Sequence, residues 1–493
     1  MSQIRLRYTG ITAYASSLLT TLTGLLFTLL ITRRLLPEEL GVWRYIGSLV
    51  AYFVIPPGIV SYWTTRMTAQ GKRVLATSLS ISSLSALATT TFFIALAEDL
   101  SKQVNTPYIV FVIVAIEIPL ISACMVLEAA LTAYRPERIY YAMMIQESVK
   151  LPTAVVVVLL LKLGLLGAIL AAIAGYVARV FTSFLFVREI GLGRLEWRTA
   201  SRILGRAWLP LYSGLQNYIA ELQFIVVVLI VGTAEVLGYA SAVLLIGSIV
   251  AISGNLSAGL YPKLLQSQSP GAVETSLKMV LLMAIPTSVG AFVLSEHILN
   301  ILRPEYKAVA PILLIALPGA LVYLVNNIID VAMTGQERAD FDDSADFKKL
   351  VRSRLFLTPT INIIQSVVYI TILIPVLFYF SRFEVTHIVA AWFATQLLLQ
   401  IPFLIYKIKL SGQINALHNI ASPFLRYLFS SAVMGVVVYA LRPLSTPLEV
   451  SQAILQILPS MVAGILTYFV TLYLTDREFR GLIGVIEKRM GLR

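Results

Sequence analysis

Long apolar runs separated by short polar segments make up the chain from one end to the other. A helix of about 20 mainly apolar residues crosses the hydrocarbon core of a bilayer, and runs of this length recur throughout the sequence. The pattern predicts fourteen membrane-spanning helices. They lie near residues 10–32, 42–66, 74–97, 107–134, 139–161, 163–186, 209–231, 236–259, 275–296, 308–334, 355–379, 384–406, 424–442 and 451–474.

The composition and the charge distribution agree with a membrane protein. Of the 493 residues 58% are hydrophobic and only 13% are charged, which is too little polar surface for a soluble chain of this size. The net charge of +12 comes from Lys and Arg between the spans, so we expect no nucleic-acid partner. With the N-terminus inside, cytoplasmic segments hold 27 Lys and Arg and outer loops hold 9. This asymmetry predicts a multi-pass protein of the plasma membrane with both termini cytoplasmic and the first helix retained.

One spanning unit occurs twice in the sequence. The stretch from Leu40-Gly41 to Ile46-Gly-Ser-Leu-Val-Ala51 returns as Leu237-Gly238 to Ile246-Gly-Ser-Ile-Val-Ala251, and further matches follow at offsets of 197 to 202 residues. Because the unit has six spans, both copies point the same way and a pseudo-two-fold axis along the membrane normal is expected. The sequence thus predicts an all-α integral membrane protein with two six-helix lobes, residues 1–206 and 207–410. Residues 411–493 add helices 13 and 14 and a basic cytoplasmic tail.

Motifs for catalysis or cofactors are missing from the sequence. One cysteine excludes an intrachain disulfide framework and a cysteine-ligated cluster, and the three histidines lie far apart. No phosphate-binding Gly-x-x-x-x-Gly-Lys-Ser/Thr loop and no nucleophile motif is present. We therefore predict no catalytic residues, no metal site and no cofactor. The segment 187–208, with arginines at steps of four, predicts a helix at the membrane interface.

A carboxylate inside a membrane span costs free energy, so its presence there indicates a function. Glu117 and Glu128 share one face of the fourth helix, and Asp330 occupies nearly the place of Glu128 in the second repeat, at an offset of 202. Together with Glu221 they are candidates for ion coupling or gating. The alternative is that each carboxylate belongs to a polar network near a helix end.

Cations and amides inside spans form a second candidate set. Lys150 stands three residues after Glu147, just before Pro152, and could hold a phosphate in a central cavity or only neutralise Glu147. Arg179 lies nearer the cytoplasmic side, where it can extend toward the interface. Asn326 and Asn327 add polarity to the second half.

Four segments carry a resemblance to a known family. They are Thr32–Trp43, Val236–Ala242, Gly259–Lys263 and Leu294–Tyr306. The chain resembles, over about residues 1–410, the polysaccharide transporter (oligosaccharide flippase) family of the multidrug/oligosaccharidyl-lipid/polysaccharide exporter superfamily. The resemblance implies two lobes around a central cavity that opens alternately to each side, with a polyprenyl-phosphate-linked sugar as cargo.

The chain departs from the family at the expected phosphate site. Relatives often hold the pyrophosphate with cavity arginines or lysines, but the first helix here has no charge between Gly10 and Thr32. The candidate substrate cations are therefore Arg44 and Arg66 at the ends of the second helix, together with Lys150 and Arg179.

The preferred hypothesis is a flippase, not an enzyme, that moves a lipid-linked oligosaccharide to the outer leaflet for cell-surface glycan synthesis. An ion gradient or the membrane potential would drive it. Expected partners are membrane lipid, the lipid-linked glycan and glycosyltransferases or a polymerase of the same pathway, and we expect a monomer. The alternatives are a cation-coupled exporter of organic cations, which the acidic core favours, and a membrane-embedded glycan polymerase, for which the outer loops are too short.

Overall fold

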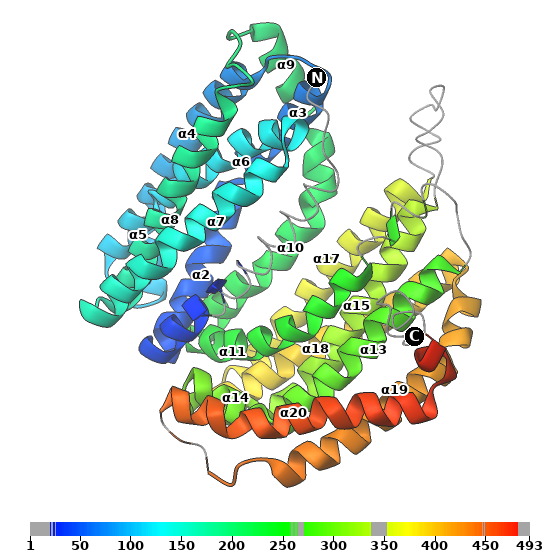
Figure 1. The fold of residues 1–493 in the computed structure, drawn as a ribbon. Coiled ribbons are helices and arrows are strands. Elements are labelled where there is room, and N and C mark those ends of the chain that lie inside the picture. Colours follow the sequence, from blue (N-terminus) through cyan, green and yellow to red (C-terminus); the bar gives the residue numbers. More distant parts are fainter. Residues whose placement is uncertain are drawn as a thin grey trace. The chain divides into compact units, whose positions relative to one another are not determined.

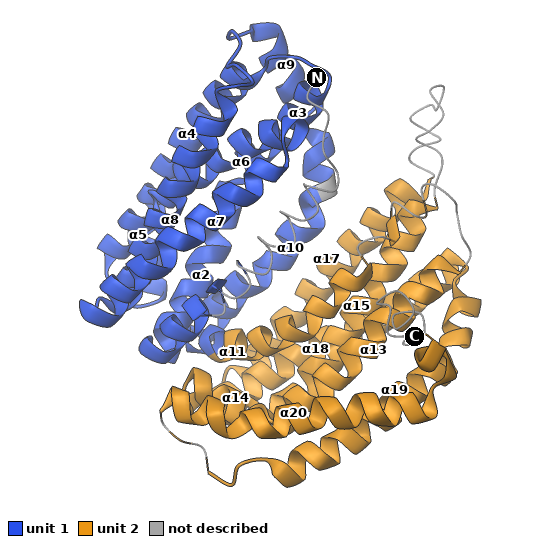
Figure 2. Cartoon of the chain, viewed as in Figure 1, with its two compact units in different colours: residues 1–238 blue, residues 239–493 orange. Residues whose placement is uncertain are grey.

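The computed structural model is helical, as Figure 1 shows, and is described for most of the chain. The described residues are 26–257, 271–336, 353–445 and 449–481, with the separate residues 20, 23, 24, 260, 261, 264 and 447. The chain divides into two compact units, an N-terminal unit of residues 1–238 and a C-terminal unit of residues 239–493 (Figure 2). The lobe boundary at 206/207 stays a prediction.

The N-terminal unit contains nine labelled helices. They are α2 (Pro37–Phe53), α3 (Ile55–Ala69), α4 (Leu75–Gln103), α5 (Tyr108–Val114), α6 (Glu117–Tyr134), α7 (Glu137–Ala154), α8 (Gly164–Val187), α9 (Trp197–Gly205) and α10 (Trp208–Val231). A π-helical segment, Val155–Leu160, continues α7. The helices α4, α6, α7 and α8 pack side by side, and α10 packs on α2 and α3.

The C-terminal unit begins at Tyr239, inside the helix α11. Its helices are α11 (Glu235–Ala251), α13 (Ala272–Val293), α14 (Ser295–Leu302), α15 (Leu313–Gly335), α17 (Arg354–Phe380), α18 (Val385–Ser411), α19 (Ile414–Leu441) and α20 (Val450–Thr475). Within this unit α15 packs on α13, α17 and α18, while α19 packs between α13 and α20.

Twelve helical segments of the described chain are long and apolar enough to cross a membrane, so the protein is a multi-pass membrane protein. A bent pair, α2 with α3, can supply a thirteenth span. The sequence predicted one continuous helix at 42–66, but the two helices meet at an angle of 55°. Pro56 and Pro57 explain the break, because proline lacks the amide hydrogen that continues a helix and is favoured in a first turn. The predicted first helix, 10–32, lies largely outside the described residues.

The predicted interfacial segment forms only a short helix. Residues 187–208 contain α9, nine residues long, whose Ala200 and Ile203 are buried where it packs on α3 and α4. Its first residue, Trp197, is exposed, as an interfacial aromatic side chain would be. The predicted helix is therefore present over the second half of the segment.

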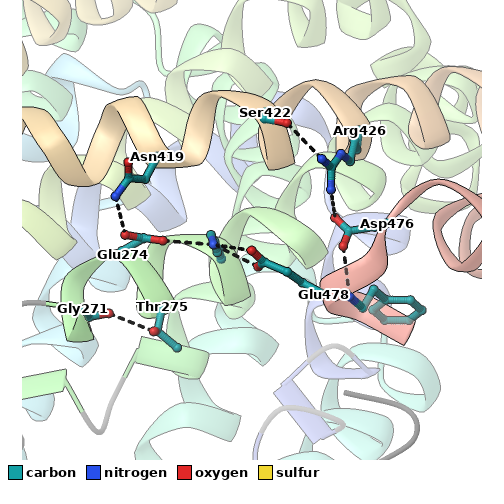
Figure 3. Close-up of polar contacts among 10 residues, drawn as sticks. Gly271, Glu274, Thr275, Asn419, Ser422, Arg426, Asp476 and Glu478 are labelled. Atoms are coloured by element: carbon teal, nitrogen blue, oxygen red, sulfur yellow. Dashed lines mark hydrogen bonds and ion pairs between the residues drawn. The ribbon is translucent and has the colours of Figure 1, made fainter. Parts of the chain in front are cut away.

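Polar contacts join the appended helices α19 and α20 to α13 and α14 at both ends of the helix pair. At one end Lys278 of α13 pairs with Glu274 and Glu478, while Asn419 of α19 donates a hydrogen bond to Glu274 and Arg426 pairs with the buried Asp476 (Figure 3). At the other end, the side chains of His297 and Asn300 in α14 contact carbonyl oxygens of Pro443 and Pro447 between α19 and α20. Ion pairs therefore hold one end of the pair α19 and α20, and contacts between side chains and backbone carbonyl oxygens hold the other end.

Two glycines from the repeated motif make equivalent close contacts inside the N-terminal unit. A Cβ atom on Gly41 of α2 would lie 1.7 Å from the carbonyl oxygen of Ala234, and one on Gly238 of α11 would lie 1.9 Å from the carbonyl oxygen of Pro37. Gly41 and Gly238 are 197 residues apart, and so are Pro37 and Ala234. The first turns of the two helices therefore cross reciprocally, and only glycine allows this approach.

We expect Gly41→Ala and Gly238→Ala each to destabilise the protein by about 2 kcal/mol or more, because the clashing atoms are backbone and cannot rotate away. Thermal unfolding in detergent measures the effect. Gly47→Ala and Gly247→Ala are matched controls, since these repeat-related glycines have no atom within 4 Å of the added Cβ. Equal melting temperatures for all four variants would contradict the close crossing.

Candidate functional site

The ionisable groups inside the spans are the natural starting point for a site, because each charge in hydrocarbon needs a partner. The sequence placed five carboxylates there, at Glu117, Glu128, Glu147, Glu221 and Asp330. In the structure four of the five lie within 4 Å of a cation of the same unit. The candidate acids and the candidate cations are therefore largely partners of one another.

Glu128 of α6 forms a two-pronged ion pair with Arg179 of α8. The guanidinium Nε and Nη2 atoms lie 2.5 and 2.6 Å from the two carboxylate oxygens, and Nη1 donates to Oε1 of Gln146 in α7 at 2.8 Å. Both charged side chains are largely buried. Parallel hydrogen bonds from one guanidinium to one carboxylate are a strong and directional contact. The network joins three helices of the N-terminal unit, and the sequence did not foresee the Glu128–Arg179 contact or the part of Gln146.

Lys150 pairs with Glu147 on its own helix, as the sequence allowed. The ammonium nitrogen lies 2.6 Å from the Glu147 carboxylate and 4.9 Å from the centre of the Phe27 ring. Gly175 of α8 lies against the same turn, where a Cβ atom would meet the Lys150 side chain at 3.1 Å. The ammonium thus has both a carboxylate and an aromatic face as partners.

Arg44 of α2 is paired more loosely. Its guanidinium lies 3.4 Å from Glu221 of α10 and 3.9 Å above the Phe224 ring, and 37% of the side chain is exposed. This distance is longer than a strong charge-assisted hydrogen bond, so a second anion can approach the same guanidinium.

Arg66 and Glu117 are the candidate site residues of the N-terminal unit for which the described part of the chain provides no ion pair. Arg66, in the last turn of α3, is exposed and stacks on the Tyr62 ring at 4.6 Å, with no carboxylate partner among the described residues. Glu117, at the start of α6, is 9% exposed and has no ion pair within the described part of the chain. One cation and one carboxylate therefore remain available for other partners.

Asp330 of α15 pairs with a lysine that the sequence analysis missed. The ammonium of Lys407 in α18 lies 2.9 Å from Oδ1 of Asp330 and 2.9 Å from Oδ1 of Asn326, and it donates to Oδ1 of Asn362 in α17. Asn327, the other predicted amide, is exposed. The C-terminal unit thus has a charged centre of its own.

Lys407 was missed because the predicted helix ended at residue 406. The structure continues α18 to Ser411, and Gly412 ends it in the left-handed conformation with φ 72°. The sequence carried this signal, because Ile408 and Leu410 prolong the apolar run and a following glycine commonly ends a helix. Lys407 then falls inside the span.

The two acids related by the repeat have related partners. Glu128 and Arg179 come from the fourth and sixth predicted spans. Asp330 comes from the tenth, and Lys407 lies on α18, directly after the predicted end of the twelfth. Each pair therefore joins equivalent helices of its own repeat. Their predicted role in ion coupling or gating stays a prediction.

An ion pair joins the first turn of α7 to the residues that follow α8, at the end that the predicted topology places in the cytoplasm. Arg138 of α7 donates a hydrogen bond to Glu189 at 2.7 Å, and Arg135 lies 3.4 Å from the same carboxylate. The hydrogen bond from Arg138 lowers the pKa of the Glu189 carboxyl group.

Comparisons with known proteins give matches at the level of structure. No protein-family model matches the chain, and no curated protein matches it. The lipid II flippase MurJ, in an inward closed conformation, superposes with a TM-score of 0.67 at 14% identity, covering 97% of this chain and 99% of MurJ. An inward-facing MATE multidrug transporter of the MOP superfamily gives 0.57 at 12% identity, covering 80% of this chain and 95% of the transporter. A MATE in complex with MaL6 gives 0.53 at 13% identity, with 82% and 95% covered.

This chain has the MurJ and MATE fold. The all-helical membrane architecture predicted from the sequence is therefore confirmed, and so is the resemblance to this group of exporters as a resemblance of fold. The charged pairs described above lie inside single units. The pairs Glu128–Arg179 and Asp330–Lys407 join different helices, whereas Glu147–Lys150 lies within α7. The number of fourteen helices stays a prediction, because the described residues supply at most thirteen spans.

Removing one member of the Glu128–Arg179 pair should cost more stability than removing both. Arg179→Met leaves a buried carboxylate without a cation, which costs about 3–5 kcal/mol, whereas Arg179→Met with Glu128→Gln leaves no charge behind. Thermal unfolding in detergent compares the variants.

The control is Lys102→Met, which removes the exposed partner of Glu98 and should leave the melting temperature unchanged. An Arg179→Met protein as stable as the double variant would show that the pair is not needed to neutralise Glu128.

Proposed function

We propose that the protein is a flippase that carries a polyprenyl-phosphate-linked oligosaccharide from the cytoplasmic to the outer leaflet of the cell membrane by alternating access. The observation that supports this most is the extent of the structural match. The MurJ fold accounts for 97% of this chain, whereas the MATE transporters account for 80% and 82%. A protein whose whole length follows a lipid II flippase is best explained as a transporter of a similar amphipathic cargo.

Arg66 is the preferred contact for the phosphate of that cargo. Lys150 and Arg179 are held by carboxylates at 2.6 and 2.5 Å, so a phosphate would have to displace a strong ion pair. Arg66 has no such competitor among the described residues, and its guanidinium lies 4.6 Å from the centre of the Tyr62 ring. Arg44 is the second candidate because its contact with Glu221 is long and a third of the side chain is exposed.

Glu117 is the preferred group for proton coupling. It is buried, and a proton can be taken up or released there without breaking an ion pair of the described chain. The other four intramembrane carboxylates each neutralise a cation, so changing their charge would leave that cation unpaired. We therefore place the driving ion at Glu117 rather than at Glu128 or Asp330.

A cation-coupled exporter of organic cations is the second candidate. The matches to MATE transporters favour it, since those proteins share the fold over four-fifths of this chain. The near balance of acids and bases within the spans argues against it, because it leaves Glu117 as the one intramembrane carboxylate free to bind an organic cation in the described part of the chain.

Arg66→Ala should slow headgroup translocation in proteoliposomes by about tenfold or more, the loss expected for a hydrogen bond to a charged group. The assay follows the outward movement of a fluorescent lipid-linked oligosaccharide made accessible to a membrane-impermeant quencher. Lys72→Ala is the matched control, since Lys72 is an exposed cation that follows the same helix.

Equal rates for wild type and Arg66→Ala would remove Arg66 from the phosphate site. If the proteoliposomes instead accumulated tetraphenylphosphonium and left the lipid-linked headgroup in place, the organic-cation exporter would replace the flippase.

Glu117→Gln should make translocation independent of an imposed pH gradient, because glutamine keeps the shape of the neutral acid and cannot carry a proton. The rate with and without the gradient is the measurement, in the same proteoliposomes. Glu98→Gln, which changes an exposed carboxylate of α4, serves as the control. A Glu117→Gln protein that still responds to the gradient like wild type would exclude Glu117 as the proton carrier.

A further inference from the structure

The side chains around Lys407 have the composition of a cation site. Its ammonium nitrogen is surrounded by oxygens only: both carboxylate oxygens of Asp330, at 2.9 and 3.1 Å, and the amide oxygens of Asn326 and Asn362. The three oxygen-bearing residues come from two helices, α15 and α17, and the lysine reaches them from a third, α18. The lysine side chain is 0% exposed, so the centre is closed around its charge.

The oxygen-bearing residues are held in place independently of the lysine. The amide nitrogen of Asn362 donates to Oδ2 of Asp330 at 3.1 Å, and Asn326 and Asp330 lie one turn apart on α15. Ile329, Met333 and Ile361, from the same two helices, form a buried apolar cluster. The amide oxygens therefore face the ammonium because their nitrogens are turned to the carboxylate.

Carboxylate and amide oxygens are the ligands that hard cations prefer. The group carries one negative charge, so a single positive charge makes it neutral, whereas a divalent ion would leave an uncompensated charge in an apolar region. Among the described residues no three His, Cys, Asp or Glu side chains gather as they would for a transition metal. The matching ligand class is a monovalent hard cation such as Na⁺.

We propose that Asp330, Asn326 and Asn362 form a monovalent-cation site that the chain fills permanently with the Lys407 ammonium group. The C-terminal unit then needs no ion from solution at this position, and removal of the ammonium opens the site to Na⁺. The inference concerns ion binding and holds whatever the protein transports.

The test is Lys407→Met. Methionine keeps an unbranched apolar side chain in the buried position and leaves out the terminal ammonium, so a cation can take its place. Thermal unfolding of the purified full chain is measured in NaCl and in choline chloride at equal ionic strength. We expect Na⁺ to raise the melting temperature of Lys407→Met by about 5 °C at saturation, as a ligand that binds only the folded state does, and to leave wild type unchanged.

The double variant Lys407→Met with Asp330→Asn is the matched control. It lacks both charges, and we expect it to fold equally well in either salt. A Lys407→Met protein with no preference for Na⁺ over choline would overturn the proposal. So would one that fails to fold in every salt while the double variant folds.

Wild type provides a measurement that needs no variant to fold. Because the ammonium already occupies the site, the melting temperature of wild type should be equal in NaCl and choline chloride. A specific Na⁺ stabilisation of wild type that Asp330→Asn abolishes would show that Na⁺ enters beside the lysine, and the proposal would fail.

Discussion

A charge inside the hydrocarbon of a membrane is stable only beside an opposite charge, and this constraint orders the interior of both units. Glu128 is held by Arg179, Glu147 by Lys150, and in the other unit Asp330 by Lys407. Two of these contacts join different spans and so decide which helix faces come together. The third stays within α7 and neutralises it locally. Loss of a single partner therefore affects helix packing as well as charge.

Close packing between helices is a second requirement, and it explains the positions of several small residues. Lipid gives helices no hydrophobic reason to associate, so backbone approach and polar contacts must supply the attraction. Gly41 and Gly238 bring two helix starts into backbone contact, and Gly175 lets α8 approach the turn of α7 that carries Lys150. In the last case the close packing and the ion pair occur on the same turn. Small residues and paired charges therefore act together in holding neighbouring helices close.

The sequence predicted the helices well because length and apolarity alone determine whether a segment can span a bilayer. It predicted less of the charged centres, because a partner on another helix cannot be read from spacing along one helix. Lys150 and Glu147 were paired correctly, being three residues apart, whereas the partners of Glu128 and Asp330 were not found. Lys407 was missed for a further reason, since apolarity fades at helix ends and the last turn was assigned to a loop. The break between α2 and α3 was not predicted, although Pro56-Pro57 explains it, because the apolar run is continuous across the bend.

Charge pairing also changes what the acidic core means for function. The acidic core suggested a centre that attracts cations, but Lys407 had been placed outside the spans and the pairs between different helices had not been seen. With the pairs assigned, most of the candidate carboxylates inside the described spans are neutralised by a cation. Under the proposed function, the groups that remain to respond to a substrate or an ion are Arg66 and Glu117. Arg66 suits an anion because no carboxylate of the described chain competes for it, and Glu117 suits a proton because binding it disturbs no pair. In the proposed flippase, an anionic cargo at Arg66 and a proton at Glu117 would therefore occupy separate places, and neither would need to displace the other.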